Sequence, residues 1–138
     1  MAGKTPAQVY SLVFGATLLI AGILGFFYSA AFGTPGETDA LLGIFEVNGW
    51  HNVVHILSGV VGLALAGSAA GARSFALGFG VVYLVVTIWG FAVGDGGEIL
   101  GFLPVNTEDN ILHLAISLAG IAAGLLSSDR RETRTATA

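Results

Sequence analysis

The sequence predicts an all-α membrane protein with four transmembrane helices, built as two tandem helical hairpins that run in the same direction. Composition is the first observation behind this prediction: the chain of 138 residues is 54% hydrophobic and only 10% charged, whereas about 25% of residues in a soluble domain are charged. The second is a set of four uncharged apolar windows near the length of about 20 residues that a helix needs to cross lipid. The third is an internal repeat.

The first predicted helix begins at Thr5-Pro6-Ala7-Gln8, which has the pattern of a capping box with proline at the first helical position. It continues to about Ala30. A removable signal peptide is the alternative, because Lys4 precedes the apolar run and Ser29-Ala30-Ala31 resembles a cleavage site. The run is longer than a usual signal core and matches a later span, so we expect a permanent helix.

Turn-forming and capping residues divide the rest of the chain. Gly33-Thr34-Pro35-Gly36 marks a turn in a long first loop, and Asp95-Gly96-Gly97-Glu98 ends the third helix. We expect one transmembrane domain over residues 1–128, with repeat one at about 6–70 and repeat two at about 73–128, and a disordered cytoplasmic tail at 129–138. The other predicted segments are helix two from its N-cap Asn48 to about Ala70, a connection at Gly71-Ala72-Arg73, helix three from Ser74 to about Val93, and helix four from its N-cap Asn106.

One polar stretch occurs twice in the chain. Its two copies lie 58 positions apart (106 minus 48). A second offset, of 65 positions (79 minus 14), relates Phe14-Gly15 to Phe79-Gly80 in the spans that precede the two polar stretches. Because each copy holds two spans, both copies cross the membrane in the same direction, and a pseudo-twofold axis along the membrane normal should relate them. The repeated polar residues are Asn48, Asn52 and His55, followed 58 positions later (106 minus 48) by Asn106, Asn110 and His113.

Charge is divided unequally between the two ends of the predicted spans. The loops after helices one and three hold acids and no Lys or Arg. Since basic residues favour the cytoplasmic side, we expect a multi-pass protein of the cell membrane with both termini in the cytoplasm. The basic residues are Lys4, Arg73, Arg130, Arg131 and Arg134, and the aromatic residues expected at the outer interface are Phe26, Phe27, Tyr28, Trp50 and Trp89.

Small residues at a four-residue spacing predict which helices meet. Gly62 and Ala66 in helix two align with Gly120 and Gly124 in helix four, and such pairs let helix backbones approach closely in lipid. We therefore expect helices two and four to form the central contact. Small-residue faces also favour self-association or a membrane-protein partner. The net charge of −4 argues against a nucleic-acid partner.

The repeated polar residues are the candidate functional site. Asn48, Asn52 and His55 share one face of helix two, because they lie at i, i+4 and i+7. Unpaired polar groups at this depth cost several kcal/mol, so both sets should face the bundle or a wet pocket, with the two repeated histidines at equal depth. In a structural interpretation, the outer asparagines cap the helices and the inner side chains bond to loops or across the bundle. The corresponding residues of helix four are Asn106, Asn110 and His113.

Ligand binding is the alternative to a structural role. His55 and His113 at matched depth could ligate a haem iron, or a metal ion together with a carboxylate. His51 lies in the right region to be a third metal ligand, although Asp109 takes its place in the second copy. A quinone, an ion or another small molecule could also bind there, since histidine exchanges protons near neutral pH. The carboxylates close to such a metal site in the sequence are those of Glu46, Glu108 and Asp109.

Several kinds of chemistry are excluded by what the sequence does not contain. The chain has no cysteine, which excludes disulfides, thiolate nucleophiles and iron–sulfur ligation. It contains no catalytic constellation and no phosphate-binding loop, and no acid or base lies in the middle of a predicted span. We therefore expect a non-enzymatic structural or accessory membrane component, with no cofactor strongly implied.

Two motifs resemble those of a known family. One is His51-Asn52-Val53-Val54-His55 followed by Gly59 and Gly62, and the other is Leu103-Pro104-Val105-Asn106 followed by Asp109-Asn110-Ile111-Leu112-His113. With these motifs the chain resembles, from about Gln8 to Leu126, a family of small bacterial and archaeal membrane proteins known as domain of unknown function 4383. The resemblance implies four membrane helices and no established activity.

Overall fold

The computed structural model describes residues 3–33 and 38–127, and within these ranges it contains four α-helices and four short strands. The strands form two separate antiparallel hairpins, each placed between two helices. The predicted turn at residues 33–36, except Gly33, and the predicted tail at 129–138 lie outside the described residues. In chain order the elements are α1 (Pro6–Gly25), β1 (Asp39–Leu41), β2 (Phe45–Val47), α2 (Gly49–Leu65), α3 (Ala69–Val93), β3 (Gly97–Ile99), β4 (Leu103–Val105) and α4 (Thr107–Leu126).

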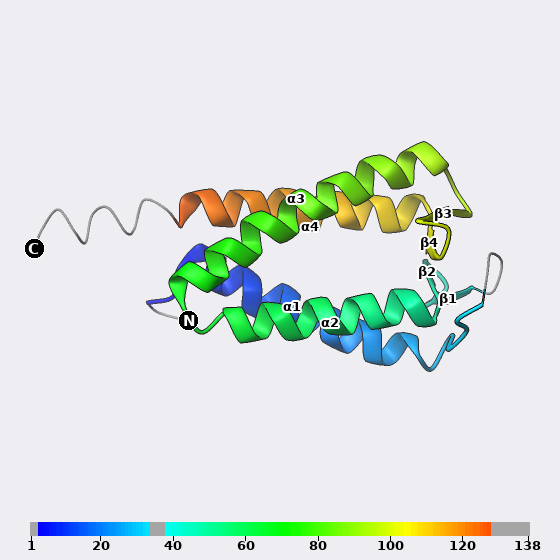
Figure 1. The fold of residues 1–138 in the computed structure, drawn as a ribbon, viewed down its shortest axis with the longest axis horizontal. Coiled ribbons are helices and arrows are strands. Elements are labelled where there is room, and N and C mark those ends of the chain that lie inside the picture. The colour runs from blue at the N-terminus through cyan, green and yellow to red at the C-terminus, as the bar shows by residue number, and fades with distance from the viewer. Residues whose placement is uncertain (1–2, 34–37, 128–138) are drawn as a thin grey trace, which may run out of the picture.

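The helices form two antiparallel pairs. α1 packs along α2 and α3 packs along α4, and the two pairs meet where α1 contacts α3 and α4. Figure 1 shows both β-hairpins at one end of the bundle, and the start of α1, the α2–α3 connection and the end of α4 at the other. Hydrogen bonds join the elements of that second end: Gln8 Nε2 donates to the Ala66 carbonyl (3.1 Å), and the Ala7 N–H donates to Ser127 Oγ (2.9 Å).

α2 and α4 do not form the central contact of the bundle, so that prediction was wrong. The small residues of both helices pack against other partners. A Cβ at Gly62 would meet the Phe75 ring of α3, and a Cβ at Gly120 would meet the Ala76 carbonyl of α3 and the Tyr10 ring of α1. A glycine spacing permits close approach but carries no information on which helix approaches, because every neighbouring helix backbone fits it equally well.

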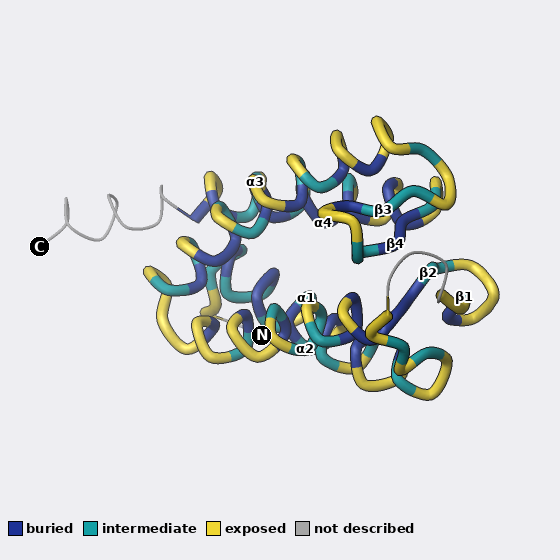
Figure 2. The backbone as a smooth tube through the Cα atoms, turned by 45° about the vertical axis from the view of Figure 1, so that its right-hand side comes forward, coloured by how far each residue is buried: buried dark blue, intermediate teal, exposed yellow. Residues whose placement is uncertain are grey.

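Small and polar side chains are buried in the bundle together with a core that includes Tyr10 and Phe75, and many large apolar side chains lie on the outside. Asn52, Asn110 and Ser117 are almost fully buried, whereas Ile20 and Ile88 are 57% and 64% exposed. Figure 2 shows the buried positions along the facing sides of the helices. A soluble protein rarely exposes apolar surface so extensively, and a lipid environment accounts for it. α1, α3 and α4 are long and apolar enough to cross a membrane, and α2 is a shorter apolar helix.

Helix α1 begins as the sequence predicts and ends earlier. Thr5 Oγ1 accepts a hydrogen bond from the Gln8 N–H (3.2 Å), and Gln8 Oε1 accepts one from the Thr5 N–H (3.1 Å), which confirms the capping box. The helix ends at Gly25, not near Ala30, and the chain continues through a turn to Tyr28. The apolar run outlasts the helix, so hydropathy overestimates its length.

The connection between α2 and α3 is short, as predicted, but lies further back in the chain. α2 ends at Leu65, and α3 begins at Ala69 with Ser68 as its N-cap. Ser68 Oγ accepts the Gly71 N–H (3.0 Å). The residues predicted to connect the helices, 71–73, therefore lie in the first turns of α3, because the serine cap satisfies a free helical N–H there.

The two β-hairpins are elements that the all-α prediction did not include. Strands β1 and β2 pair with Leu41 opposite Phe45, and β3 and β4 pair in the equivalent way. Each turn holds a leucine with positive φ, Leu42 at 56° and Leu100 at 57°, followed by a glycine with positive φ. Leucine rarely adopts this left-handed conformation, and the usual Asn-Gly or Asp-Gly signal is absent. In the sequence, only the repeat offset of 58 positions (100 minus 42) marks these two Leu-Gly pairs.

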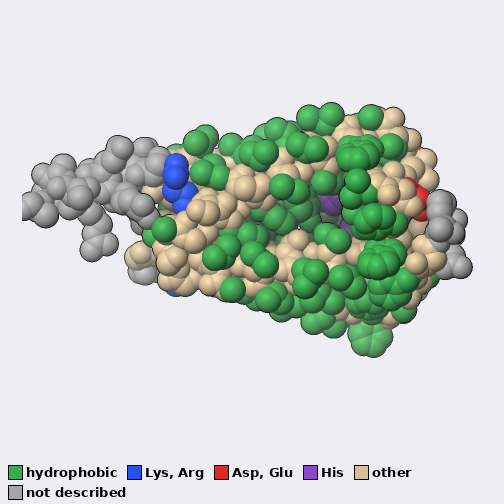
Figure 3. Space-filling view, viewed as in Figure 1, with side chains coloured by type: hydrophobic (Ala, Val, Ile, Leu, Met, Phe, Trp, Pro, Cys, Tyr) green, Lys and Arg blue, Asp and Glu red, His purple; other side chains and the backbone are tan. Residues whose placement is uncertain are grey.

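Among the residues that the structure describes, acidic and basic side chains lie at opposite ends of the bundle. Figure 3 shows Lys and Arg at the end of the α2–α3 connection, and Asp and Glu at the end of the β-hairpins. Arg73 in α3 donates from Nε to the Gly124 carbonyl near the end of α4 (3.2 Å). Of the predicted basic set, Arg130, Arg131 and Arg134 lie outside the described residues.

Candidate functional site

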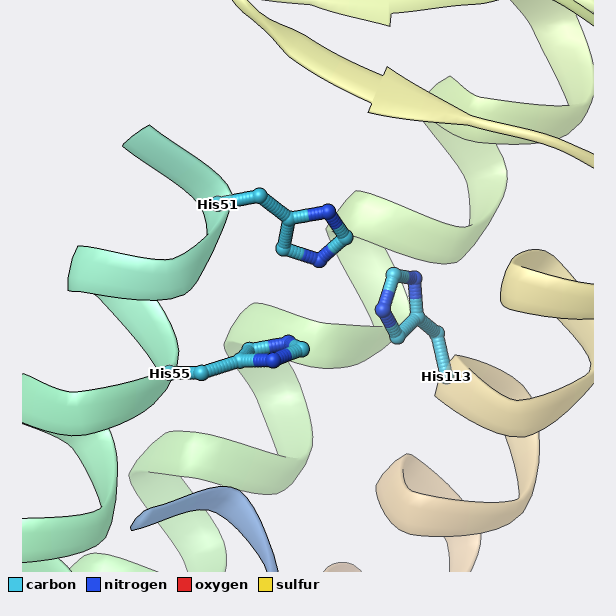
Figure 4. Close-up of side chains that lie close together, drawn as sticks. All are labelled: His51, His55 and His113. Carbon is cyan, nitrogen blue, oxygen red and sulfur yellow. The ribbon is translucent and has the colours of Figure 1, made fainter. Parts of the chain in front are cut away.

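All three histidines of the chain converge on one point (Figure 4). His51 and His55 come from the first two turns of α2, and His113 comes from the second turn of α4. One ring nitrogen of each histidine lies within 4.8 Å of one ring nitrogen of each of the other two. The His51 ring centroid is 4.4 Å from that of His55 and 6.3 Å from that of His113. The histidines therefore face each other across the two helix pairs, and we call them the histidine cluster.

Two asparagine caps fix the helix starts that carry this cluster. Asn48 Oδ1 and Asn106 Oδ1 each accept the backbone N–H three residues later, at 2.8 Å, which confirms both predicted N-caps. The same side chains also reach the opposite half: Asn48 Nδ2 donates to the Phe102 carbonyl and Asn106 Nδ2 to the Ile44 carbonyl, both at 2.7 Å. Each cap thus ties one helix start to the turn of the other β-hairpin.

The inner asparagines serve helix packing and not the cluster. Asn52 Nδ2 donates to the Ser29 carbonyl (2.8 Å), and Asn52 Oδ1 occupies the place that a Cβ on Gly25 would need. Asn110 Oδ1 lies in the same way against Gly90. Of the six predicted site residues, the two histidines therefore come together, whereas the four asparagines cap helices or fill the contact within one helix pair.

His51 and Asp109, which the repeat places at equivalent positions, both contact Glu46 in β2. His51 Nδ1 lies 2.9 Å from the Glu46 carbonyl oxygen, and because a carbonyl only accepts, this nitrogen carries the proton. Asp109 Oδ2 accepts the Glu46 N–H (3.1 Å). Pro104, the repeat equivalent of Glu46, has no N–H to offer, so the arrangement is one-sided. Burial, followed by the negative charge of Asp95, raises the pKa of the Glu46 carboxyl.

A cavity of about 650 Å³ lies beside the histidine cluster, lined by α1, α4 and the β1–β2 hairpin. Its wall is largely apolar, and the three histidines and Asp109 contribute polar groups to it. The lining residues Ile20, Leu24 and Phe27 are 57%, 48% and 82% exposed, so the cavity opens onto the apolar surface of the bundle. In Figure 3 histidine atoms are visible in a hollow between the two helix pairs.

The sequence contained one half of the signal for this cluster. His51 and His55 are four residues apart, so both lie on one face of α2, and histidines at this spacing can chelate a metal. The repeat relates His55 to His113 and predicts that these two form a pair. It leaves out His51, because the counterpart of His51 is an aspartate. The approach of His113 to the other two rings depends on how the helix pairs pack, and no local pattern reports that.

The fold and its surface define the class of protein: a bundle of four helices whose apolar exterior is consistent with a membrane protein. A family model described as Domain of unknown function (DUF4383) matches residues 8–126, so the chain belongs to this family. The resemblance expected from the two motifs is thereby confirmed. No curated protein and no solved structure matches the chain. The family description contains no activity.

Proposed function

We propose that this protein is a non-enzymatic accessory component of the cell membrane that binds a membrane-soluble small molecule beside its histidine cluster. In this proposal all four helices cross the bilayer, with the β-hairpins at the outer surface and both termini in the cytoplasm. α2 has 17 residues, which is at the lower end of the range of about 17–25 that can span. The apolar cavity with polar groups on its wall is the observation that carries the function.

Equivalent contacts in the two halves support a tandem repeat with a pseudo-twofold axis along the membrane normal. The contact of Gly25 with Asn52 recurs as the contact of Gly90 with Asn110, at the offsets of 65 (90 minus 25) and 58 (110 minus 52) found in the sequence. The asparagine bonds between each cap and the opposite hairpin turn recur at the offset of 58 as well. A helical hairpin that was copied once, with both copies crossing in the same direction, accounts for these pairs.

The separation of charge supports the orientation. Lys4 and Arg73 lie at the end of the bundle with the α2–α3 connection, while Glu46, Asp95 and Glu98 lie on or beside the β-hairpins. Basic residues favour the cytoplasmic side of a membrane. The histidine cluster, which is next to the hairpins, would then lie near the outer surface, within the first two turns of α2 and α4.

The shape of the cavity indicates the chemistry of its ligand. Its volume lies within the range of roughly 300–1,000 Å³ typical of small-molecule sites. Its exposed apolar lining on α1 would let a molecule enter from the lipid. The histidines and Asp109 offer hydrogen-bond partners to one part of that molecule. We therefore assign the cavity an amphiphile with an apolar body and a carbonyl or hydroxyl head group, a class that includes quinones.

A cavity-filling variant tests this function. Ala21 lines the cavity, so Ala21→Phe should occupy it. Ala64→Phe adds the same volume at an exposed position of α2 that does not line the cavity, and it is the matched control. Wild type and both variants are purified in mild detergent from native membranes, and organic extracts are analysed by mass spectrometry. An amphiphile that accompanies wild type and Ala64→Phe in stoichiometric amount, and falls several-fold in Ala21→Phe, supports the proposal. Equal lipid content in all three proteins contradicts it.

A further inference from the structure

We propose that His51, His55 and His113 together bind one divalent transition-metal ion, such as Zn²⁺, at the polar part of the cavity wall. The inference rests on the ring nitrogens of the cluster and not on the apolar wall. It therefore goes beyond the binding of an amphiphile and can be tested apart from it. Imidazole nitrogen is a ligand that suits zinc, copper, nickel and iron.

The spacing of the rings fits one shared ion. Zinc binds histidine nitrogen at about 2.0–2.1 Å, so nitrogens on neighbouring corners of its tetrahedron are roughly 3.3 Å apart. One nitrogen of each ring lies within 4.8 Å of one nitrogen of each of the others, and side-chain rotations would have to close the remaining difference when an ion binds. Two of the ligands come from one helix four residues apart, and the third comes from the facing helix (Figure 4). A single ion would link the two helix pairs at this point.

Hydrogen bonding leaves the cluster with nitrogen lone pairs to share. The Glu46 carbonyl accepts the His51 Nδ1 proton at 2.9 Å, which leaves Nε2 of His51 as the lone-pair nitrogen. A backbone carbonyl bonded to the far nitrogen in this way is the usual support of a metal-binding histidine. His113 is only 5% exposed, and its Nδ1 has no hydrogen-bond partner among the described residues. A bound cation would interact with the lone pairs of all three imidazoles more effectively than a shared proton donor would.

Asp109 brings a carboxyl group to the wall of the same cavity. It occupies the repeat position of His51, and it lines the cavity together with the three histidines. Its Oδ2 accepts the N–H groups of Glu46 (3.1 Å) and Asn106 (3.2 Å), which hold the carboxylate in position. Three neutral imidazoles would leave the double charge of the ion uncompensated, and the ion would favour the ionised form of the Asp109 carboxyl, which offsets part of that charge. Within the described residues, no Lys or Arg lines this cavity.

A single ion fits the cluster better than a haem. In a bis-histidine haem the porphyrin plane passes between the two axial rings. Here one ring nitrogen of the third histidine lies within 4.8 Å of one ring nitrogen of each of the others, so that a macrocycle between any two of the rings would need the space of the third. Three protein ligands also leave a fourth zinc position open, and a water or the head group of the ligand would fill it from the cavity.

The test is a metal titration of full-length protein in detergent, purified with a tag free of histidine and stripped with a chelator. Zn²⁺ binding is measured by calorimetry, and Co²⁺ is then used as a visible probe of four-coordinate nitrogen ligation. The variants are His51→Ala, His113→Ala and the more conservative His113→Asn. Glu98→Gln is the matched control, because it removes an acid from β3, at the same end of the bundle, without touching the cluster.

Wild type and Glu98→Gln should bind Zn²⁺ at one ion per chain and give the same Co²⁺ spectrum. Each histidine variant should bind Zn²⁺ at least about 10–100-fold more weakly and lose that spectrum. Ala21→Phe should lose the amphiphile and keep the metal, which separates the two proposals. The metal proposal is overturned if wild type binds neither ion, or if the His113→Asn protein, folded by its thermal transition, binds Zn²⁺ as tightly as wild type.

Discussion

At the scale of single residues, glycines set the distance between α1 and α2. A Cβ at Gly59 would lie 2.6 Å from the Leu19 backbone nitrogen and 2.7 Å from the Gly15 carbonyl oxygen. Both atoms are main-chain atoms of α1, so no side-chain rotation can relieve the overlap. The van der Waals contact that holds helices together in lipid therefore depends on the missing methyl group.

Replacing a Cα hydrogen of Gly59 with a methyl group is expected to separate α1 from α2. Gly59→Ala should lower the free energy of unfolding by about 1–3 kcal/mol, the usual cost of overpacking. Gly78→Ala is the control, since a Cβ there meets nothing within 4 Å in α3, and alanine is the better helix former. Thermal unfolding in one detergent compares the two proteins with wild type. Equal losses for both variants would mean that close packing at Gly59 is not the cause.

The sequence identified residues that lie at the site, but it did not predict the contacts that each of them makes. Asn48, Asn52 and His55 were grouped because they share a helix face. The side chains on that face, however, contact two different parts of the structure. Asn52 bonds to Ser29 within its own half, and Asn48 bonds to Phe102 of the other half. Helical spacing reports the direction of a side chain and contains no information about what lies opposite.

At the scale of the elements, the starts of α1, α2 and α4 were predictable, whereas the start of α3 and the ends of α1 and α2 were not. Asn48, Asn106 and the Thr5 capping box are local signals, because a cap bonds to a backbone N–H only a few residues away. α1 stops at Gly25 while apolar residues continue, and the β-hairpins depend on leucines in a left-handed conformation that the sequence gives no reason to expect. Non-local packing decides these features.

The asparagine caps are expected to act on two elements at once. Asn48→Ala removes a helix cap, worth about 0.5–2 kcal/mol, and also the partly buried hydrogen bond to the Phe102 carbonyl, and a carbonyl left without its partner costs up to about 1–3 kcal/mol. Asn106→Ala removes the equivalent pair, with a more exposed bond to the Ile44 carbonyl. Ser68→Ala removes a cap alone, from α3. The expected order of destabilisation in thermal unfolding is Asn48→Ala, then Asn106→Ala, then Ser68→Ala.

This series has a clear contrary outcome. If Asn48→Ala costs no more than Ser68→Ala, its bond to the opposite hairpin contributes nothing, and the caps do not join the two halves. The comparison uses the same detergent and scan rate for all proteins, because stability in detergent changes with both.

At the scale of the whole molecule, composition and hydropathy predicted most of the architecture. Four helices, their order and an apolar exterior follow from the four uncharged windows, since a lipid-facing surface leaves a strong compositional record. The pairing of the helices does not, because glycine spacing in α2 and α4 suits any close neighbour. For the same reason the meeting of His51, His55 and His113 needed the packed structure, although two of them share a helix face.

The central claim is that all four helices, including the short α2, cross the membrane and carry the histidine cluster to its outer side. The chain contains no cysteine, so single cysteines can be labelled without background. Ile44→Cys and Leu100→Cys place a thiol in the turns of the two β-hairpins, and Gly67→Cys places one between α2 and α3, all at exposed positions.

Labelling of intact cells with a membrane-impermeant maleimide is the direct measurement. The thiols at residues 44 and 100 should react, whereas the thiol at residue 67 should react only after the membrane is opened. Reaction at 44 and 67 from the same side would mean that α2 does not cross, and reaction at 67 alone would place the histidines at the cytoplasmic face.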